Sequence, residues 1–250
     1  VLATSTPDLT FPAVATMVQA ALGMTRGFAY DVQAVCAGFV FALANALGLI
    51  LGGQARRVLV IGAETFSRIL DMEDRSTAVL FGDGAGAAVV EAVPAEYGIR
   101  SMVMGADGSG GVHLHKRSVG KCLPGGEPLA EHVYMNGREV FKFAVRVMTT
   151  STFEAIEKAG LQPAEISLFV PHQANLRIID AARERLGLER ERVIVTVDEY
   201  GNNSTASIPL ALQHAHDEGR VAAGDHLLLV SFGSGLTWAS SVVTWAPEAA

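Results

Sequence analysis

The sequence predicts an α/β protein, because segments with strand character alternate with segments of helical character along almost the whole chain. An internal repeat supports this prediction. A strand, a loop containing Cys36, a helix, Gly52 and a further strand follow one another, and the same order returns around a loop containing Asn202 and a later Gly219. Two such halves would bring their helix-opening loops together at a pseudo-twofold axis, where a reaction centre could form.

The expected strands and helices follow from apolar runs, from helical periodicity and from the turn residues between them. Strands are expected at 1–4, 28–33, 57–64, 167–172, 192–197, 226–235 and 239–245, with a β-rich arm at 77–93. Helices are expected at 13–23, from residue 36 onward, and at 137–159, 175–187 and 208–219. Residues 105–128 are rich in Gly, His and Pro and lack periodicity, so we expect this insertion to cover another part of the molecule.

Residues 34–53 run for twenty positions without a charge, which is long enough to span a bilayer. However, Asn45 interrupts the run, small residues crowd one end, and a strand follows within a few residues. These features favour a helix buried inside an α/β sandwich over a membrane span.

Composition limits the possible functions and locations. The 250 residues suffice for one large domain or two fused halves, and the 50% hydrophobic content implies a substantial core. A formal net charge of −7 argues against general nucleic-acid binding. Cys36 and Cys122 cannot form a disulfide framework and no secretory signal opens the chain, so we expect a cytoplasmic location. Because Val1 begins inside an apolar run without an initiator Met, the chain reads as a fragment or a processed piece.

Three polar residues follow strands in this pattern. Cys36 opens the buried helix, where the helix dipole favours a thiolate, although a lone Cys is more often a small buried hydrophobe. His172 follows the apolar strand at 167–170, and Asn202 lies in a turn-rich loop before a helix; a core histidine and a capping Asn are the alternatives. Taken together, a nucleophile with a His and an amide indicates thioester chemistry.

Two other signals are weaker than they look. Residues 82–87 match a GxGxxA dinucleotide fingerprint, but only six residues separate them from Pro94, which leaves no room for the phosphate-binding helix. We expect a strand whose small residues allow close packing. His113 and His115 alternate like a pair of ligands, but no nearby Cys or carboxylate completes a set, so no metal site is predicted.

Basic residues recur near these positions. Arg138, Lys142 and Arg146 are spaced by four along one helix, and Arg177 follows His172 by five residues. A solvated helix face is one explanation. A docking patch for an acidic carrier protein or a phosphate is the other.

The chain resembles the β-ketoacyl-acyl carrier protein synthase III family, which initiates fatty-acid synthesis. The resemblance runs from Val1 to about Trp245 and rests on six segments: DVQAVCAGF, DRSTAVLFGDGAGAAV, MNGREVFKFAV, VPHQANLRI, YGNNSTASIPLAL and SFGSGLTW. It implies a five-layered αβαβα thiolase-like fold with two pseudo-duplicated halves, at 1–98 and 99–250, and with the family's N-terminal segment missing before Val1. It also implies a homodimer that uses acyl-CoA and malonyl-acyl carrier protein as substrates and needs no cofactor, metal, nucleic acid or membrane.

The same resemblance assigns roles to individual residues. Cys36, His172 and Asn202 would be the catalytic triad, and the N–H groups of Cys36 and Ser234 would form an oxyanion hole. The substrate-binding site would be lined by Arg75, Met135, Gly137, Phe141, Asn175, Ile178, Phe232 and, across the dimer interface, Phe11. The carrier protein would dock on Arg177, Lys142 and Arg185.

Two residues depart from the family pattern: Ser234 stands where the family usually has Gly, and Asn203 where it usually has Thr. Other functions remain open for the same residues. One is a related polyketide or quinolone-type condensing enzyme with malonyl-CoA as second substrate. Another is a non-catalytic partner subunit, which would have no need of the triad, and the last is an inactive clipped fragment.

Overall fold

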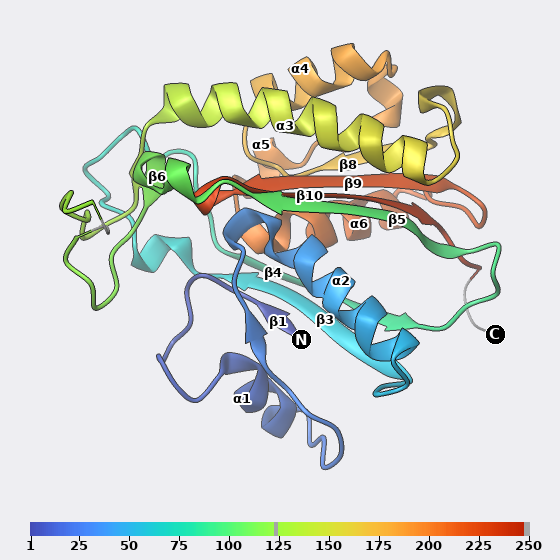
Figure 1. Cartoon of the computed structure of the whole chain (residues 1–250), viewed down its shortest axis with the longest axis horizontal. Helices are drawn as coiled ribbons and strands as arrows, with labels where there is room; N and C mark the ends of the chain where they lie inside the picture. The colour runs from blue at the N-terminus through green and yellow to red at the C-terminus, as the bar shows by residue number, and fades with distance from the viewer. Residues whose placement is uncertain (123–124, 248–250) are drawn as a thin grey trace.

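Two four-stranded sheets lie face to face, with helices between them and on both outer sides (Figure 1). The computed structural model describes residues 1–122 and 125–247. From bottom to top in Figure 1 the layers are α1 (Val14–Ala21), the first sheet, the helix pair α2 (Gly38–Leu51) and α6 (Ser207–Asp217), the second sheet, and α3 (Gly137–Lys158) with α4 (Leu176–Leu186). This is the five-layered αβαβα architecture that the resemblance implies.

The first sheet has the strand order β2-β1-β3-β4. Its strands are β1 (Leu2–Ala3), β2 (Asp31–Val32), β3 (Arg57–Glu64) and β4 (Gly84–Glu91). The first three are parallel, whereas β4 runs antiparallel to β3.

The second sheet has the strand order β5-β10-β9-β8. Its strands are β5 (Gly98–Ala106), β8 (Leu168–Pro171), β9 (His226–Gly233) and β10 (Thr237–Thr244). Here β8 is parallel to β9, and β10 is antiparallel to both β9 and β5. The antiparallel pair β9–β10 therefore corresponds to β3–β4 in the first sheet; the sequence repeat predicted the correspondence of β9 with β3.

The central helices are buried through their apolar residues, and α2 carries a single polar side chain, Asn45. Phe39, Val40 and Ala42 of α2 and Ile208 and Ala211 of α6 are at most 2% exposed, and they pack with strands of both sheets. The uncharged run around α2 is therefore a core helix. In the part of the chain that the structure describes, no helix combines the length and apolarity needed to cross a membrane.

Three predicted strands, at 28–33, 77–93 and 192–197, differ from the structure, and β5 was not predicted at all. The run at 28–33 contains only the two-residue β2, and the arm at 77–93 becomes a strand only at Gly84. The segment 192–197 is not a strand. It makes one bridge, between Val193 and Phe169, and Val193 and Ile194 are buried without a ladder of hydrogen bonds before the short helix α5 (Val197–Tyr200) begins.

The small residues at 82–87 open β4 and allow α6 to approach the sheet. A side chain at Gly86 would come within 2.8 Å of Pro209, and one at Gly84 within 2.8 Å of Asn203. These residues form a close-packed strand, as expected, and not a phosphate-binding loop.

Candidate active site

Cys36 lies in a strained turn at the start of α2. The 3₁₀ turn η1 (Val35–Ala37) joins β2 to α2, and Cys36 is 5% exposed. Val35 immediately before it has a φ of +46°, a left-handed conformation that is costly for a β-branched residue. Surrounding structure must hold such a residue in place, and strained backbone of this kind is common at functional sites.

The ends of β9 and β10 provide this support. A side chain at Gly233 would lie 2.7 Å from the backbone N of Cys36 and 3.1 Å from the carbonyl O of Ala34, so only glycine fits. Thr237 Oγ1 donates a hydrogen bond of 3.0 Å to the same Ala34 carbonyl. The backbone of the Cys36 turn is thus packed directly on the Gly233–Ser234 segment.

Burial keeps the Cys36 thiol protonated at rest. It raises the pKa of Cys36 to about 12, while a hydrogen bond with the Ser204 hydroxyl acts in the opposite direction. The nearby Glu64 carboxylate raises this pKa further, and the backbone N–H of Cys36 itself lowers it.

His172 is a neutral, fully enclosed imidazole at the end of β8. It is 1% exposed, and its ring stands edge-on to Phe232 with ring centroids 5.4 Å apart. Burial lowers the pKa of His172 to about 3. Nδ1 lies 3.0 Å from the hydroxyl of Ser207, the first residue of α6. If that hydroxyl donates to Nδ1, Nε2 carries the proton and is a hydrogen-bond donor.

Asn202 is fixed by backbone pairing with residues 80–82. Its N–H donates to Leu80 O at 2.8 Å, and its carbonyl accepts from Gly82 N at 3.0 Å. The side-chain Oδ1 accepts from Ser204 N at 3.0 Å, which leaves the Nδ2 amide as the donor available to a ligand. This pairing also explains why residues 77–82 are not part of β4.

One loop connects all three residues. Ser204 opens the 3₁₀ turn η6 (Ser204–Ala206) with a φ of +49°, which corresponds to Val35 at the start of η1. The same loop contains Asn202, lies against the Cys36 turn and reaches the His172 ring through the Ser207 hydroxyl. The two turns are in contact, since a side chain at Gly38 would lie 2.8 Å from Thr205 Cγ2.

The other predicted site residues are more scattered. Phe232 and Ile178 are buried, Asn175 accepts from Arg177 N as the N-cap of α4, and Phe141 is 39% exposed on α3. Met135 belongs to β7 (Tyr134–Met135), which pairs with β6 (Leu114–His115), Gly137 begins α3, Arg75 is exposed in a turn, and Phe11 is 82% exposed. A hollow of about 990 Å³ lies elsewhere, between α1, β1 and β3, and its lining includes none of these residues.

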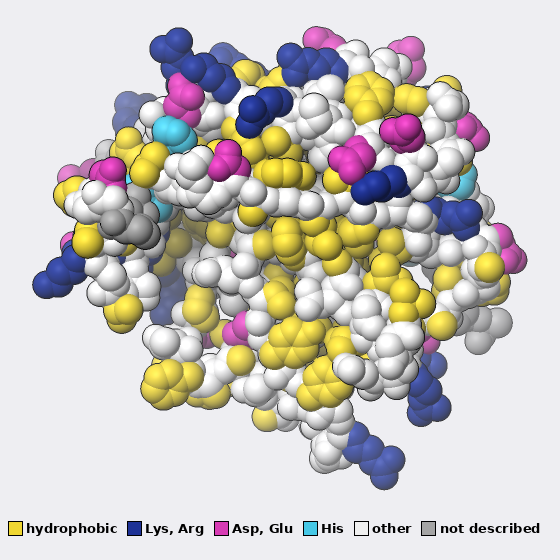
Figure 2. All heavy atoms as spheres, viewed as in Figure 1, with side chains coloured by type: hydrophobic (Ala, Val, Ile, Leu, Met, Phe, Trp, Pro, Cys, Tyr) yellow, Lys and Arg dark blue, Asp and Glu magenta, His cyan; other side chains and the backbone are white. Residues whose placement is uncertain are grey.

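The basic residues assigned to docking lie on α3 and α4. Arg177 is exposed, and Lys142 pairs with Glu139 at 2.7 Å. Arg185 donates to the carbonyl of Val145, so part of its guanidinium joins the two helices. Figure 2 shows Lys and Arg side chains over this side of the molecule, at the top of the view, with acidic side chains between them.

Sequence reasoning missed four residues of the site: Glu64, Ser204, Ser207 and Gly233. The two serines lie in the loop that was assigned to Asn202 alone. Glu64 was detectable in principle, because a carboxylate at the end of an otherwise apolar strand needs a buried partner.

The fold and this cluster define a thiolase-type condensing enzyme, and comparisons with known proteins agree. Family models for 3-oxoacyl-[acyl-carrier-protein (ACP)] synthase III and for its C-terminal part match residues 30–108 and 156–245. The chain belongs to the β-ketoacyl-[acyl-carrier-protein] synthase III family. It is accordingly an acyltransferase that forms carbon–carbon bonds in the initiation of fatty-acid synthesis.

Individual relatives are similar over nearly the whole chain. The β-ketoacyl-[acyl-carrier-protein] synthase III of Deinococcus deserti is 50% identical over 98% of this chain and 70% of its own length, and that of Rhodobacter capsulatus 54% identical over 98% and 76%. The crystal structure of the Thermus thermophilus enzyme is 62% identical with a TM-score of 0.97, over 99% of this chain and 77% of that one.

Proposed function

We propose that Cys36 accepts an acyl group from acyl-CoA and passes it to malonyl-acyl carrier protein, with His172 and Asn202 supporting the second step. The observation that carries this proposal is the loop 202–207, which contains Asn202, packs against Gly38 beside the Cys36 turn and lies 3.0 Å from the His172 ring through the Ser207 hydroxyl. Acyl-CoA is a substrate in this scheme, and the reaction needs no cofactor or metal.

In the first half-reaction the Cys36 thiolate attacks the thioester carbonyl. The backbone N–H groups of Cys36 and Ser234 stabilise the oxyanion that forms, and CoA leaves. The close packing of Gly233 on the Cys36 backbone supports this role, because it places the residue before Ser234 directly against the backbone N of Cys36. The Ser234 hydroxyl is occupied by the Leu114 carbonyl, so the backbone N–H is the group assigned to the substrate.

In the second half-reaction His172 Nε2 and Asn202 Nδ2 hold the thioester oxygen of the malonyl group. Decarboxylation leaves an enolate, which these two donors stabilise, and its carbon attacks the acyl group on Cys36. The low pKa of His172 suits this role, because a neutral ring remains the same donor across the physiological pH range.

The remaining assignments concern binding. The CoA channel would be lined by Arg75, Met135, Gly137, Phe141, Asn175 and Ile178. Phe232 would lie beside the acyl group on Cys36. Phe11, which is 82% exposed, would meet the acyl pocket of a second copy in a homodimer. The carrier protein is acidic in this proposal and docks on Arg177, Lys142 and Arg185. The cytoplasm is the proposed location.

The Arg177→Glu variant tests the proposed second substrate. Condensation should need at least tenfold more malonyl-acyl carrier protein, because a docking charge is reversed, while acylation by acyl-CoA stays unchanged. Arg56→Glu, the same charge reversal at an exposed site just before β3, should behave like the wild type.

The same assay separates the alternative function. A priming β-ketosynthase from the R1128 polyketide pathway is 38% identical with a TM-score of 0.88. If malonyl-CoA replaces the malonyl carrier protein at equal concentration and Arg177→Glu has no effect, carrier docking at this site is wrong and a polyketide-type or quinolone-type reaction is favoured.

A further inference from the structure

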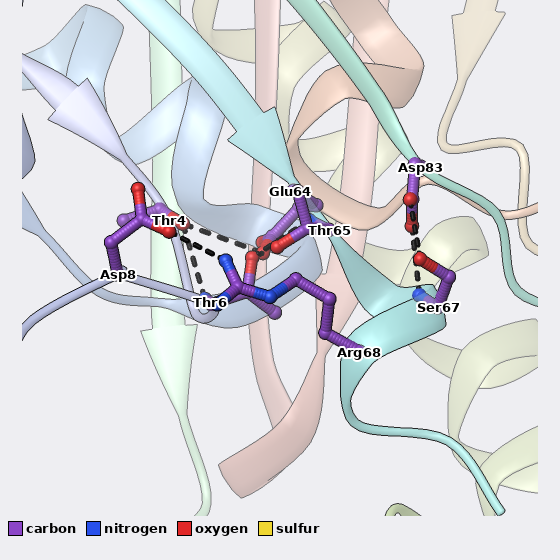
Figure 3. A network of polar contacts seen from close by, with 8 residues as sticks. All are labelled: Thr4, Thr6, Asp8, Glu64, Thr65, Ser67, Arg68 and Asp83. Carbon is purple, nitrogen blue, oxygen red and sulfur yellow. Dashed lines mark hydrogen bonds and ion pairs between the residues drawn. The ribbon is translucent and has the colours of Figure 1, made fainter.

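Glu64 is a buried carboxylate at the end of β3, and hydrogen bonds from both halves of the chain converge on it. It is 3% exposed. From the loop after β1, Ser5 donates through its backbone N at 3.1 Å and through Oγ at 2.8 Å. Thr6 Oγ1 donates to the other carboxylate oxygen at 2.7 Å (Figure 3). Arg68, in the same view, pairs with Asp8, and each hydrogen bond that the described residues make to Glu64 comes from a neutral donor.

The second half of the chain meets the same carboxylate through the turn η6. Ser204 Oγ donates to Glu64 Oε1 at 3.1 Å, and Thr205 Oγ1 lies 3.2 Å from that oxygen. The backbone of the turn also packs on β3, because a side chain at Gly62 would lie 2.3 Å from Thr205 O. Ser204 has a φ of +49°, and a non-glycine residue keeps such a conformation when its surroundings hold it there. Two hydroxyl groups bound to one buried carboxylate provide this constraint.

Ser204 passes the constraint on to the two groups assigned to decarboxylation. Its backbone N–H donates to Asn202 Oδ1 at 3.0 Å, which determines that the Nδ2 end of the amide is left for a ligand. Three residues after Ser204, the Ser207 hydroxyl lies 3.0 Å from His172 Nδ1. A displacement of the turn would therefore move both Asn202 and the hydrogen-bond partner of His172.

The Cys36 turn has separate support at the ends of β9 and β10. Gly233 packs on the Cys36 backbone, and Thr237 Oγ1 donates to Ala34 O at 3.0 Å. The Glu64 carboxylate also raises the pKa of Cys36, so its removal would favour the thiolate. Loss of Glu64 should therefore not slow the attack of Cys36 on acyl-CoA.

We propose that Glu64 is a positioning residue for the decarboxylation half-reaction. Through Ser204 it fixes the turn that orients the Asn202 amide and the hydrogen-bond partner of His172. Glu64 itself does not contact the substrate in this role. The inference rests on the proposed function, and it adds that a carboxylate from the first half of the chain sets the geometry of donors from the second half.

The test compares the rates of acylation and of malonyl decarboxylation in single turnovers, because a residue that only stabilises the fold would not change their ratio. In Glu64→Ala, decarboxylation should slow at least about tenfold more than acylation, since a small misplacement of catalytic groups is costly. The double variant Ser204→Ala/Thr205→Val keeps Glu64 and the N–H that meets Asn202, but it removes both hydroxyl links. It should change the ratio in the same direction, and it decides the question if Glu64→Ala does not fold.

Two further variants make the test specific. Ser5→Ala removes a hydroxyl from the same carboxylate oxygen on the side away from η6, so the ratio of the two rates should stay at the wild-type value. Glu64→Ala added to the double variant should not change the ratio again, because both changes act through the same hydrogen bonds.

A wild-type ratio in the folded double variant, or equal slowing of both half-reactions, would overturn the proposal. A further loss of decarboxylation when Glu64→Ala is added would also overturn it, since Glu64 would then act by a route other than η6. Asn202→Ala separates this inference from the proposed function. If Asn202→Ala slows both half-reactions equally, the proposed roles are wrong and the inference falls with them; if it slows decarboxylation alone and the double variant does not, only the role of Glu64 is wrong.

Discussion

Asn202→Ala is expected to leave acylation of Cys36 nearly intact and to slow malonyl decarboxylation by about 100- to 1000-fold, the usual cost of one oxyanion donor. The reason is geometric. Its Oδ1 is held by Ser204 N, so Nδ2 is the group free to meet the enolate oxygen, which exists only in the second half-reaction. The measurement is a pair of single-turnover assays, with acyl-CoA alone and with malonyl-acyl carrier protein.

Asn203→Ala is the matched control for this variant. Asn203 is on the same turn and 1% exposed, but a side chain at Gly84 would contact it, so it faces β4. We expect lower stability with little change in the ratio of the two half-reactions. Equal loss of both half-reactions in Asn202→Ala would contradict the division of roles between Cys36 and Asn202.

Gly233→Ala should reduce the rate of acylation by at least about 100-fold, in line with loss of an oxyanion donor. The added methyl group would lie 2.7 Å from the Cys36 backbone N, which forces the turn or the β9 end to move. Acylation is followed by intact-protein mass spectrometry after mixing with acetyl-CoA.

Gly48→Ala provides the comparison on the same helix as Cys36. A side chain at Gly48 meets no atom within 4 Å, and alanine favours a helix more than glycine does, so stability should be unchanged or higher. If Gly233→Ala acylates at the wild-type rate while remaining folded, the backbone of Cys36 is not part of the oxyanion site.

The sequence predicted best where one signal determined the structure. The repeat placed Cys36 and Asn202 in equivalent helix-opening loops, and the structure has two such turns, each opened by a residue with positive φ. The uncharged run at 34–53 predicted a core helix because a strand follows it within a few residues, as expected for a helix inside an α/β sandwich. Local composition was sufficient in both cases.

Prediction from the sequence failed where residues distant in the chain determine whether a segment forms a strand. Residues 192–197 have the composition of a strand, but Thr196 N is taken by the Gln173 side chain, so the segment is buried without forming a ladder. Residues 98–106 become β5 only because β10, more than 130 residues later in the chain, pairs with them. No local pattern contains that information.

Prediction of the active site was limited in the same way by contacts between residues that are distant in the chain. Cys36, His172 and Asn202 follow strands and were visible as candidates, but their partners are not local. Ser204 and Ser207 acquire roles only when the loop is folded against the other half, and Glu64 only when residues 4–6 and 204–205 converge on it. The lining of the CoA channel stays a prediction, because the residues assigned to it are dispersed over several elements. The boundary between the two halves at 98/99 also remains a prediction, although β5 begins at Gly98.

The central claim is that Cys36 is the acyl acceptor, and intact-protein mass spectrometry before and after incubation with acetyl-CoA and longer acyl-CoAs tests it most directly. The account predicts a mass increase equal to one acyl group, located by digestion on the peptide with Cys36, and none in the folded Cys36→Ser variant. A folded wild type that gains no acyl group, or an acyl group that persists in Cys36→Ser, would contradict it.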